Sequence, residues 1–274
     1  MSMGESRIIT IALVGAGSVA THLGLALKNA GYKVEYVLNR GAERGTVLAE
    51  KLEARYVTGF DQLVKPDLMI IAVSDDAIPV MARQLGLCTF PVVHTSGTIA
   101  KEVLSVTGPD YGVFYPLQSF SPDKEVDFLK VPICIDASNT ALIQRLEDVA
   151  RSLSQTVCLI DDSKRKILHL AAVFACNFSN YLYGIAHDLL AENDIPFELL
   201  LPLIQETAMK VQVRSAFDAQ TGPAKRGDVS TIRQHLDMIQ NDPKLLKIYK
   251  TFTDNILKTY SHQFSTSDIH PEEE

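Results

Sequence analysis

Residues 12–27 read ALVGAGSVATHLGLAL: an apolar run meets two glycines and then continues with helical spacing. Residues 7–15, which end at the first of these glycines, are mostly apolar and rich in β-branched side chains. This pattern predicts a buried strand that ends at Gly15. Apolar residues recur at helical spacing after the glycines, and Gly31 marks the end of the predicted helix. The glycines therefore lie where a strand meets a helix, and this turn either binds a phosphate or only changes the direction of the chain.

The spacing Gly15-x-Gly17-x-x-Ala20 fits the dinucleotide fingerprint G-x-G-x-x-G/A. In such a loop the first glycine permits a tight turn, and the second lets a pyrophosphate approach the backbone. The small third residue lets the helix pack close to the strand. The helix N-terminus adds free N–H groups and a partial positive charge. The predicted cofactor-binding residues of this loop are Gly15, Ala16, Gly17, Ser18, Val19 and Ala20.

The end of the second predicted strand, residues 32–40, favours NADP over NAD. An NAD site usually has an acidic residue there, about 20 residues after the glycines, to hold the ribose 2′-hydroxyl. This chain has Asn39 and Arg40 instead. The planar guanidinium of Arg40 suits a 2′-phosphate, so NADP(H) is the expected cofactor. The alternative is a simple turn with Arg40 in solvent. The missing acid also weighs against a methyltransferase.

Strands and helices alternate through the first part of the chain, which indicates parallel βαβ units. Further strands are predicted at residues 67–75, 90–97, 111–116, 131–137 and 155–161. After them the pattern is helical only, over residues 163–191, 196–218, 228–240 and 243–262. The sequence thus predicts an α/β fold: a doubly wound Rossmann domain over residues 1–162, followed by an all-α domain over residues 163–274.

Composition narrows the function. The 274 residues carry a net charge of −7, which argues against a nucleic-acid partner. The four cysteines are far apart and form no C-x-x-C pair, so we expect no metal site and a reducing, cytoplasmic location. Residues 167–186 contain no Lys, Arg, Asp or Glu, but the polar side chains within them are costly in lipid. We therefore expect a helix buried in protein and no membrane partner.

Two more loops follow predicted strands, where open α/β sheets bind ligands. Val73 and Ser74 end one strand beside the expected cofactor, and Asp75 and Asp76 are expected to cap the next helix. The sequence HTSG at residues 94–97 ends another. His94 and Ser96 are candidates for substrate or catalytic contacts, with local capping as the alternative for Ser96.

These residues carry a resemblance to a known group of enzymes. ALVGAGSVATHL, VLNR, IIAVSDDAI and HTSG resemble the Rossmann domain of pyrroline-5-carboxylate reductases and deazaflavin-dependent NADP oxidoreductases, with the 6-phosphogluconate and β-hydroxyacid dehydrogenases as wider relatives. YPLQSFS, HLAAVFACNFSNYL and TGPAKRGDVSTIRQHL resemble a helical domain of unknown function found after such domains in bacterial NADP oxidoreductases. The resemblance implies a homodimer formed through the helical domain and a small-molecule substrate in the cleft between domains.

The resemblance also suggests catalytic positions. The dehydrogenases have Lys-x-x-x-Asn on the helix that corresponds to residues 163–191; if Asn177 is that asparagine, Val173 stands where the lysine would be. His169 lies eight residues before Asn177, about two helical turns away, and a histidine there can act as general acid. The alternative is a core histidine. Arg226, in TGPAKRGD, could bind a substrate carboxylate or the cofactor phosphate of a partner subunit.

Two functions remain open on the sequence. The first is an NADP-dependent oxidoreductase that moves hydride to or from a small carbonyl or imine compound, with His169 as the leading proton donor and His94 behind it. The second is a nucleotide-binding regulator or scaffold that kept the cofactor site and lost catalysis, as the missing lysine suggests.

Overall fold

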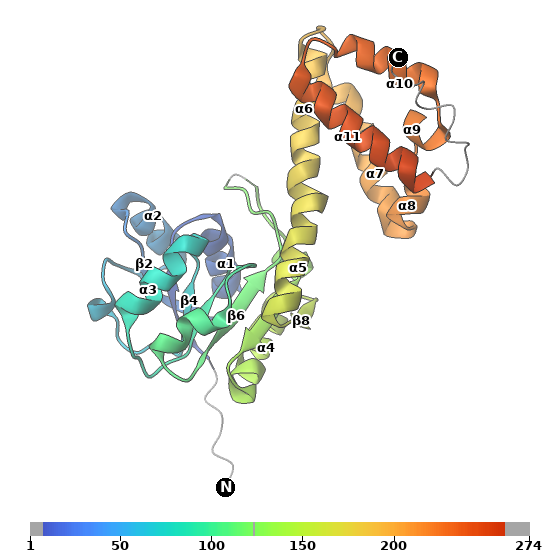
Figure 1. Cartoon of the computed structure of the whole chain (residues 1–274). Helices are drawn as coiled ribbons and strands as arrows, with labels where there is room; N and C mark the ends of the chain where they lie inside the picture. The colour runs from blue at the N-terminus through green and yellow to red at the C-terminus, as the bar shows by residue number, and fades with distance from the viewer. Residues whose placement is uncertain (1–7, 123, 261–274) are drawn as a thin grey trace. The chain divides into compact units, whose positions relative to one another are not determined.

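The computed structural model describes residues 8–122 and 124–260. The chain divides into two compact units, residues 1–183 and residues 184–274. The strands, all in the first unit, are β1 (Thr10–Val14), β2 (Lys33–Leu38), β3 (Arg55–Val57), β4 (Leu68–Ile71), β5 (Val92–His94), β6 (Tyr111–Pro116), β7 (Ile133–Ala137) and β8 (Val157–Leu159). The longer helices of the first unit are α1 (Ser18–Asn29), α2 (Ala42–Leu52), α3 (Ile78–Leu85), α4 (Thr140–Leu153) and α5 (Asp162–Ala172) (Figure 1).

The strands form one sheet in the order β3-β2-β1-β4-β5-β6-β7-β8. Neighbouring strands are parallel except β6 and β7, which pair antiparallel. The order reverses at β1, where the chain leaves for β2 and β3 on one side and later returns to β4 on the other. In open α/β sheets this switch point is where ligands bind, beyond the carboxyl ends of the strands.

Helices cover both faces of the sheet, which explains why its strands are apolar almost throughout. Successive side chains of β1 alternate between two cores. Ile11 and Leu13 pack with the apolar faces of α1, α2 and α4, while Ala12 and Val14 pack with α3 and the 3-10 helix η3 (Lys101–Thr107). The predicted doubly wound α/β fold is therefore confirmed.

Two features differ from the predicted strand pattern. Residues 55–57 form β3, which the sequence analysis does not predict because three residues are too few to show an alternating pattern. The expectation of parallel units is wrong for β7, which pairs antiparallel with β6. In the described part of the connection, residues 117–122 and 124–132, the helical element is the short 3-10 helix η4 (Phe128–Lys130), whereas a parallel crossover usually carries an α-helix.

A nearly continuous helix follows β8: α5, then a π-helical segment η5 (Val173–Phe178), then α6 (Ser179–Ala191). The predicted domain boundary at residue 162 coincides with the start of α5, whereas the compact units divide inside α6, between Tyr183 and Gly184. No helix of the described residues is long and apolar enough to cross a membrane.

The second unit is helical throughout its described residues. Its elements after α6 are η6 (Phe197–Leu200), α7 (Leu201–Val213), α8 (Ala216–Ala219), α9 (Pro223–Arg226), α10 (Val229–Met238) and α11 (Pro243–Tyr260). Ala224, Ile232 and Leu257 form a small core between α9, α10 and α11. The predicted all-α region is thus confirmed.

Candidate functional site

The first glycine of the loop is required by the fold. Gly15 has φ of +113°, a conformation that residues with a Cβ rarely adopt. A Cβ at this position would also overlap the carbonyl oxygen of Ala72, at the end of β4. The Gly15 N–H donates to the Leu38 carbonyl of β2 at 2.8 Å. Gly15 therefore joins the ends of three neighbouring strands at the switch point.

The second glycine faces open space. Gly17 is exposed, and a Cβ there would meet nothing within 4 Å. Gly17 precedes α1, and among the described residues no side chain caps this helix and no acidic residue lies in its first turn. Ala20 is fully buried, which lets α1 pack on the sheet. The exposed N–H groups at the start of α1 therefore fit an anion such as a pyrophosphate.

The turn after β2 leaves the side chain of Arg40 free to bind a ligand. Asn39 donates from Nδ2 to the Gly41 carbonyl at 2.8 Å, and its own carbonyl accepts from the Tyr56 hydroxyl at 2.9 Å. These bonds fix the turn. Arg40 is exposed, and no described residue forms a hydrogen bond or ion pair with it. Its guanidinium can therefore reach a phosphate beyond this end of the sheet.

At the end of β4, Val73 packs against the core and Ser74 is exposed. The expected capping by Asp75 and Asp76 is wrong, because no side chain caps the helical turns that follow. Asp75 instead accepts a hydrogen bond from the Thr98 hydroxyl at 2.5 Å. This bond ties the loop after β4 to the loop after β5.

His94 and Ser96 are buried at the end of β5 and hold the loop in shape. The Ser96 N–H donates to His94 Nδ1 at 3.2 Å, and Ser96 Oγ accepts from the N–H groups of Thr98 and Ile99, each at 3.0 Å. Burial, with the nearby charge of Arg165, lowers the pKa of His94 to about 4. His94 is therefore a neutral imidazole at physiological pH, with its one proton on Nε2, and it is too weak an acid to serve as the proton donor.

His169 of α5 meets a residue that the sequence analysis did not single out. Its Nδ1 lies 3.1 Å from the hydroxyl oxygen of Tyr115, near the carboxyl end of β6. A Cβ on Gly97 would lie 2.6 Å from His169 Nδ1 and 2.9 Å from Tyr115 Cζ. The HTSG loop therefore packs directly on this pair. The sequence predicts the strand 111–116 that contains Tyr115, but no pattern in it indicates the contact with His169.

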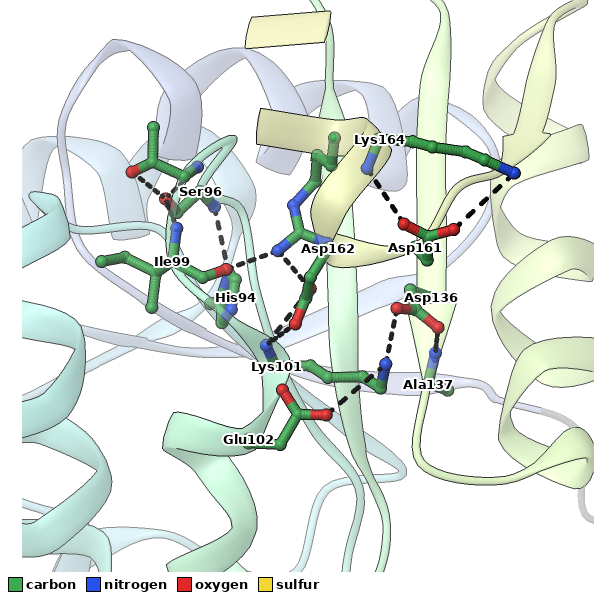
Figure 2. A network of polar contacts seen from close by, with 12 residues as sticks. His94, Ser96, Ile99, Lys101, Glu102, Asp136, Ala137, Asp161, Asp162 and Lys164 are labelled. Carbon is green, nitrogen blue, oxygen red and sulfur yellow. Dashed lines mark hydrogen bonds and ion pairs between the residues drawn. The ribbon is translucent and has the colours of Figure 1, made fainter. Parts of the chain in front are cut away.

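A buried ionic network holds α5 against the same loop (Figure 2). The Arg165 side chain is fully buried, and its Nη2 lies 2.6 Å from Asp162 Oδ1 and donates to the Ile99 carbonyl. Asp162 also accepts from the Lys101 N–H at 3.1 Å. Burial opposes the ionisation of Asp162, but the bonds to Arg165 and its charge hold the pKa of the carboxyl below its usual range.

Two predicted residues lie apart from this cluster in the contacts that the structure gives. Asn177 is exposed within the π-helical segment, and its side chain has no hydrogen bond to a described residue. Arg226 is the exposed last residue of α9 in the second unit. Near it, Asp228 caps α10 by accepting from the Thr231 N–H at 3.1 Å. The structure thus brings His94, Ser96 and His169 together, all in the first unit.

The two loop glycines should respond differently to alanine. We expect Gly15→Ala to lower the free energy of unfolding by about 2–4 kcal/mol, because it adds backbone strain and a collision with Ala72. Gly17→Ala should change that free energy by only a few tenths of a kcal/mol and should still abolish most NADPH binding. Thermal denaturation and NADPH titration check both; a Gly17→Ala protein with wild-type affinity would contradict the phosphate loop.

Gly97→Ala tests the packing of the HTSG loop on the pair. We expect a loss of about 1–3 kcal/mol in the free energy of unfolding and a displaced His169 and Tyr115, because neither ring has room for the methyl group. NADPH affinity should stay within about twofold of wild type, since the glycine loop is untouched. Gly184→Ala, where a Cβ meets nothing within 4 Å, is the matched control and should not destabilise the fold. Equal stability of the two variants would refute the tight packing.

Comparison with known proteins agrees with this geometry. Residues 10–89 match the family described as NADP oxidoreductase, coenzyme F420-dependent, and residues 131–256 match a domain of unknown function, DUF2520. No curated protein is a significant match. A solved structure from Bacteroides fragilis, provisionally described as an NADP oxidoreductase, is 39% identical with a TM-score of 0.86, covering 92% of this chain and 98% of that one.

More distant structures share the fold. An imine reductase from Myxococcus stipitatus in complex with NADP⁺ is 19% identical, with a TM-score of 0.65 over 92% of this chain and 93% of that chain. The 1-pyrroline-5-carboxylate reductase of Streptococcus pyogenes is 15% identical, with a TM-score of 0.63 over 94% and 100%. The expected resemblance is confirmed: the chain belongs to the family in which an NADP oxidoreductase domain of the coenzyme F420-dependent type is followed by a DUF2520 domain.

Proposed function

We propose that the protein is an NADP-dependent oxidoreductase that transfers hydride between NADP(H) and a small carbonyl or imine substrate. The observation that carries the proposal is the glycine loop at the switch point of the sheet. Gly15 is wedged against the Ala72 carbonyl, while Gly17 opens the N-terminus of α1 to an anion. The NADP oxidoreductase family and the NADP⁺ complex of a distant relative support the same cofactor.

The chain's own residues would hold the cofactor along the carboxyl edge of the sheet. The N–H groups of the loop from Gly15 to Ala20 would bind the pyrophosphate. Asn39 shapes the turn that presents Arg40, whose guanidinium would bind the 2′-phosphate. Val73 and Ser74 would line the path toward the nicotinamide. When bound, NADPH supplies the hydride; the protein supplies orientation and a proton.

The proton would come through His169. This side chain is half-buried at the ligand-binding edge and bonded to Tyr115, so it can exchange protons with a bound substrate and with water. His94, the second choice, is buried and neutral, and with Ser96 it would position the loop rather than transfer a proton. Asn177 remains a proposed contact for a polar group of the substrate.

The rest of the substrate site belongs to the proposal as well. We retain the cleft between the domains 1–162 and 163–274 as its place and Arg226 as the group that would bind a substrate carboxylate. A cytoplasmic location suits the four widely spaced cysteines and an NADPH-consuming reaction. The competing hypothesis, a regulator that binds NADP(H) without turnover, predicts a protein that never oxidises NADPH with any compound.

Arg40→Ala is the first experiment. A charge-assisted bidentate contact contributes about 1.5–3 kcal/mol, so the variant should bind NADPH roughly 10- to 100-fold more weakly and NADH equally well. Nicotinamide fluorescence titrations measure all four affinities. Arg55→Ala serves as the control, because it removes an exposed arginine at the amino end of β3, away from the carboxyl edge of the sheet. If wild-type protein binds neither nucleotide, the oxidoreductase proposal fails; if Arg40→Ala keeps the preference, Arg40 is not the phosphate ligand.

We also propose that the protein is a homodimer through its long helix. Five exposed apolar side chains recur on one stripe of this helix at spacings of three and four residues: Ile167, Leu170, Phe174, Phe178 and Tyr181. Phe174 is 62% exposed and packs edge-on against Phe178 with ring centroids 5.0 Å apart. An exposed apolar stripe at this spacing is typical of a helix that packs on a partner helix.

Phe174→Glu should convert this dimer to a monomer, because a carboxylate in the centre of an apolar interface would lose its hydration without a partner. Size-exclusion chromatography with light scattering measures the mass. Lys166→Glu changes an exposed residue beside the stripe and should leave the dimer intact. A monomeric wild-type protein, or a dimeric Phe174→Glu protein, would rule out this interface.

A further inference from the structure

Tyr115 and His169 come from distant parts of the sequence and form a pair at the ligand-binding edge. The hydroxyl oxygen and Nδ1 are 3.1 Å apart, and the two rings are tilted with centroids 6.2 Å apart. Each side chain is only partly buried. A hydroxyl and an imidazole at this distance can pass a proton in either direction, since each can donate or accept.

The order of the strands places this pair toward the reacting end of the cofactor. The sequence of strand ends along the edge is β2, β1, β4, β5 and β6. With the 2′-phosphate beside Arg40 after β2 and the pyrophosphate at β1, the nicotinamide must extend past β4 toward β5 and β6. Gly97 after β5 packs closely against this pair, where a Cβ would lie 2.6 Å from His169 Nδ1 and 2.9 Å from Tyr115 Cζ, so the pair lies beside the loop that follows β5.

We propose that the Tyr115 hydroxyl hands the proton to the substrate and that His169 restores it. This inference rests on the proposed function and goes further by naming the donor. It keeps His169 as the route of the proton and adds the group that makes the last transfer.

The reduction balances as follows. The carbonyl carbon accepts the hydride, the C–O π bond breaks, and its electron pair moves to the oxygen. That oxygen takes the proton of the Tyr115 hydroxyl. The resulting phenolate takes the proton from His169 Nδ1, and His169 takes up one proton from solvent at Nε2. Exchange of the imidazole N–H with solvent then returns a proton to Nδ1, so that the pair regains its starting state. The net products are the alcohol and the oxidised cofactor, with one solvent proton consumed; oxidation of the alcohol follows the same path in reverse.

The acidity of Tyr115 suits the last transfer to a carbonyl compound. Burial raises the pKa of Tyr115 to about 12, so this phenol stays protonated until it is needed. An alkoxide formed from a ketone is a strong enough base to take that proton. The carboxyls of Asp75 and Asp162 are already bonded, to Thr98 and to Arg165.

A histidine bonded to a tyrosine is not sufficient for this role. In the second unit His235 Nδ1 lies 2.8 Å from the Tyr249 hydroxyl, between α10 and α11. That pair lies on no strand end and beside no glycine loop. What distinguishes Tyr115 and His169 is their place at the carboxyl ends of β5 and β6.

The charge of the nicotinamide gives a test that needs no substrate. The ring is positively charged in NADP⁺ and neutral in NADPH, and a positive charge within about 4–6 Å lowers a pKa by about 1–3. We would label the full-length protein with [¹³Cζ]tyrosine and follow the ionisation of Tyr115 by NMR with NADP⁺ or NADPH bound. Tyr115→Phe assigns the signal. Tyr111, at the other end of β6, is the internal control.

We expect the pKa of Tyr115 to be about 1–3 lower with NADP⁺ than with NADPH, and that of Tyr111 to be the same in both. Equal values for Tyr115 in two saturated complexes would overturn the inference while leaving the cofactor site intact. Failure of both nucleotides to bind would remove the proposed function itself, and this inference with it.

Turnover supplies the second readout. With small aldehydes, ketones and cyclic imines as probes, Tyr115→Phe should lower kcat for a carbonyl compound by roughly 10²- to 10⁴-fold with little change in KM, and Tyr111→Phe should match wild type. Full turnover by Tyr115→Phe would contradict the assignment.

Discussion

The ion pair between Arg165 and Asp162 is the interaction on which the proposed catalytic site depends. Both residues belong to the first turns of α5, and Arg165 reaches from there to the Ile99 carbonyl in the loop after β5. Lys101 extends the connection to β7 through Asp136 at 2.7 Å (Figure 2). Removal of one partner from a buried pair costs about 3–5 kcal/mol, because the other charge is left without compensation. The pair thus fixes the helix that carries His169 against the HTSG loop and, through it, against Tyr115.

The two halves of the ligand-binding edge are built in opposite ways. At the glycine loop and Arg40 the protein leaves donors without protein partners in the described residues, and unpaired donors suit a charged ligand that brings its own acceptors. At the HTSG loop the hydroxyl groups are already bonded, Ser96 to two backbone N–H groups and Thr98 to Asp75, although His94 Nε2 is buried without a partner among the described residues. Bonds within the loop make it rigid, which is what the positioning of a reacting atom requires. Binding and positioning are therefore separated along the edge.

The sequence predicts the local features of the first half and misses the contacts of the second, for a physical reason. The glycine loop, its strand and its helix are local: their form follows from residues within about one βα unit, while the contacts of Arg40 with a cofactor stay a prediction. Tyr115 and Arg165 acquire their contacts only when β6, the loop after β5 and α5 come together, and no periodicity indicates that approach. The same holds for β7, whose direction depends on a connection without an α-helix in its described residues rather than on its apolar pattern, and for β3, which is too short to show one. His94 shows the opposite kind of error. Its residue type suggests a general acid, but burial lowers its pKa and keeps the imidazole neutral.

The long helix links assembly to chemistry. Arg165 and His169, one turn apart, are turned toward the sheet, whereas Ile167, Leu170 and Phe174 are exposed on another side of the same helix. A partner helix on the apolar stripe would restrict the motion of α5 and the π-helical segment, and so of the imidazole that serves Tyr115. The buried ion pair holds α5 only at its first turns, whereas His169 lies farther along the helix. Dimerisation would supply the missing restraint from the other side, so the proposed interface would be part of the preorganisation of the proposed proton route.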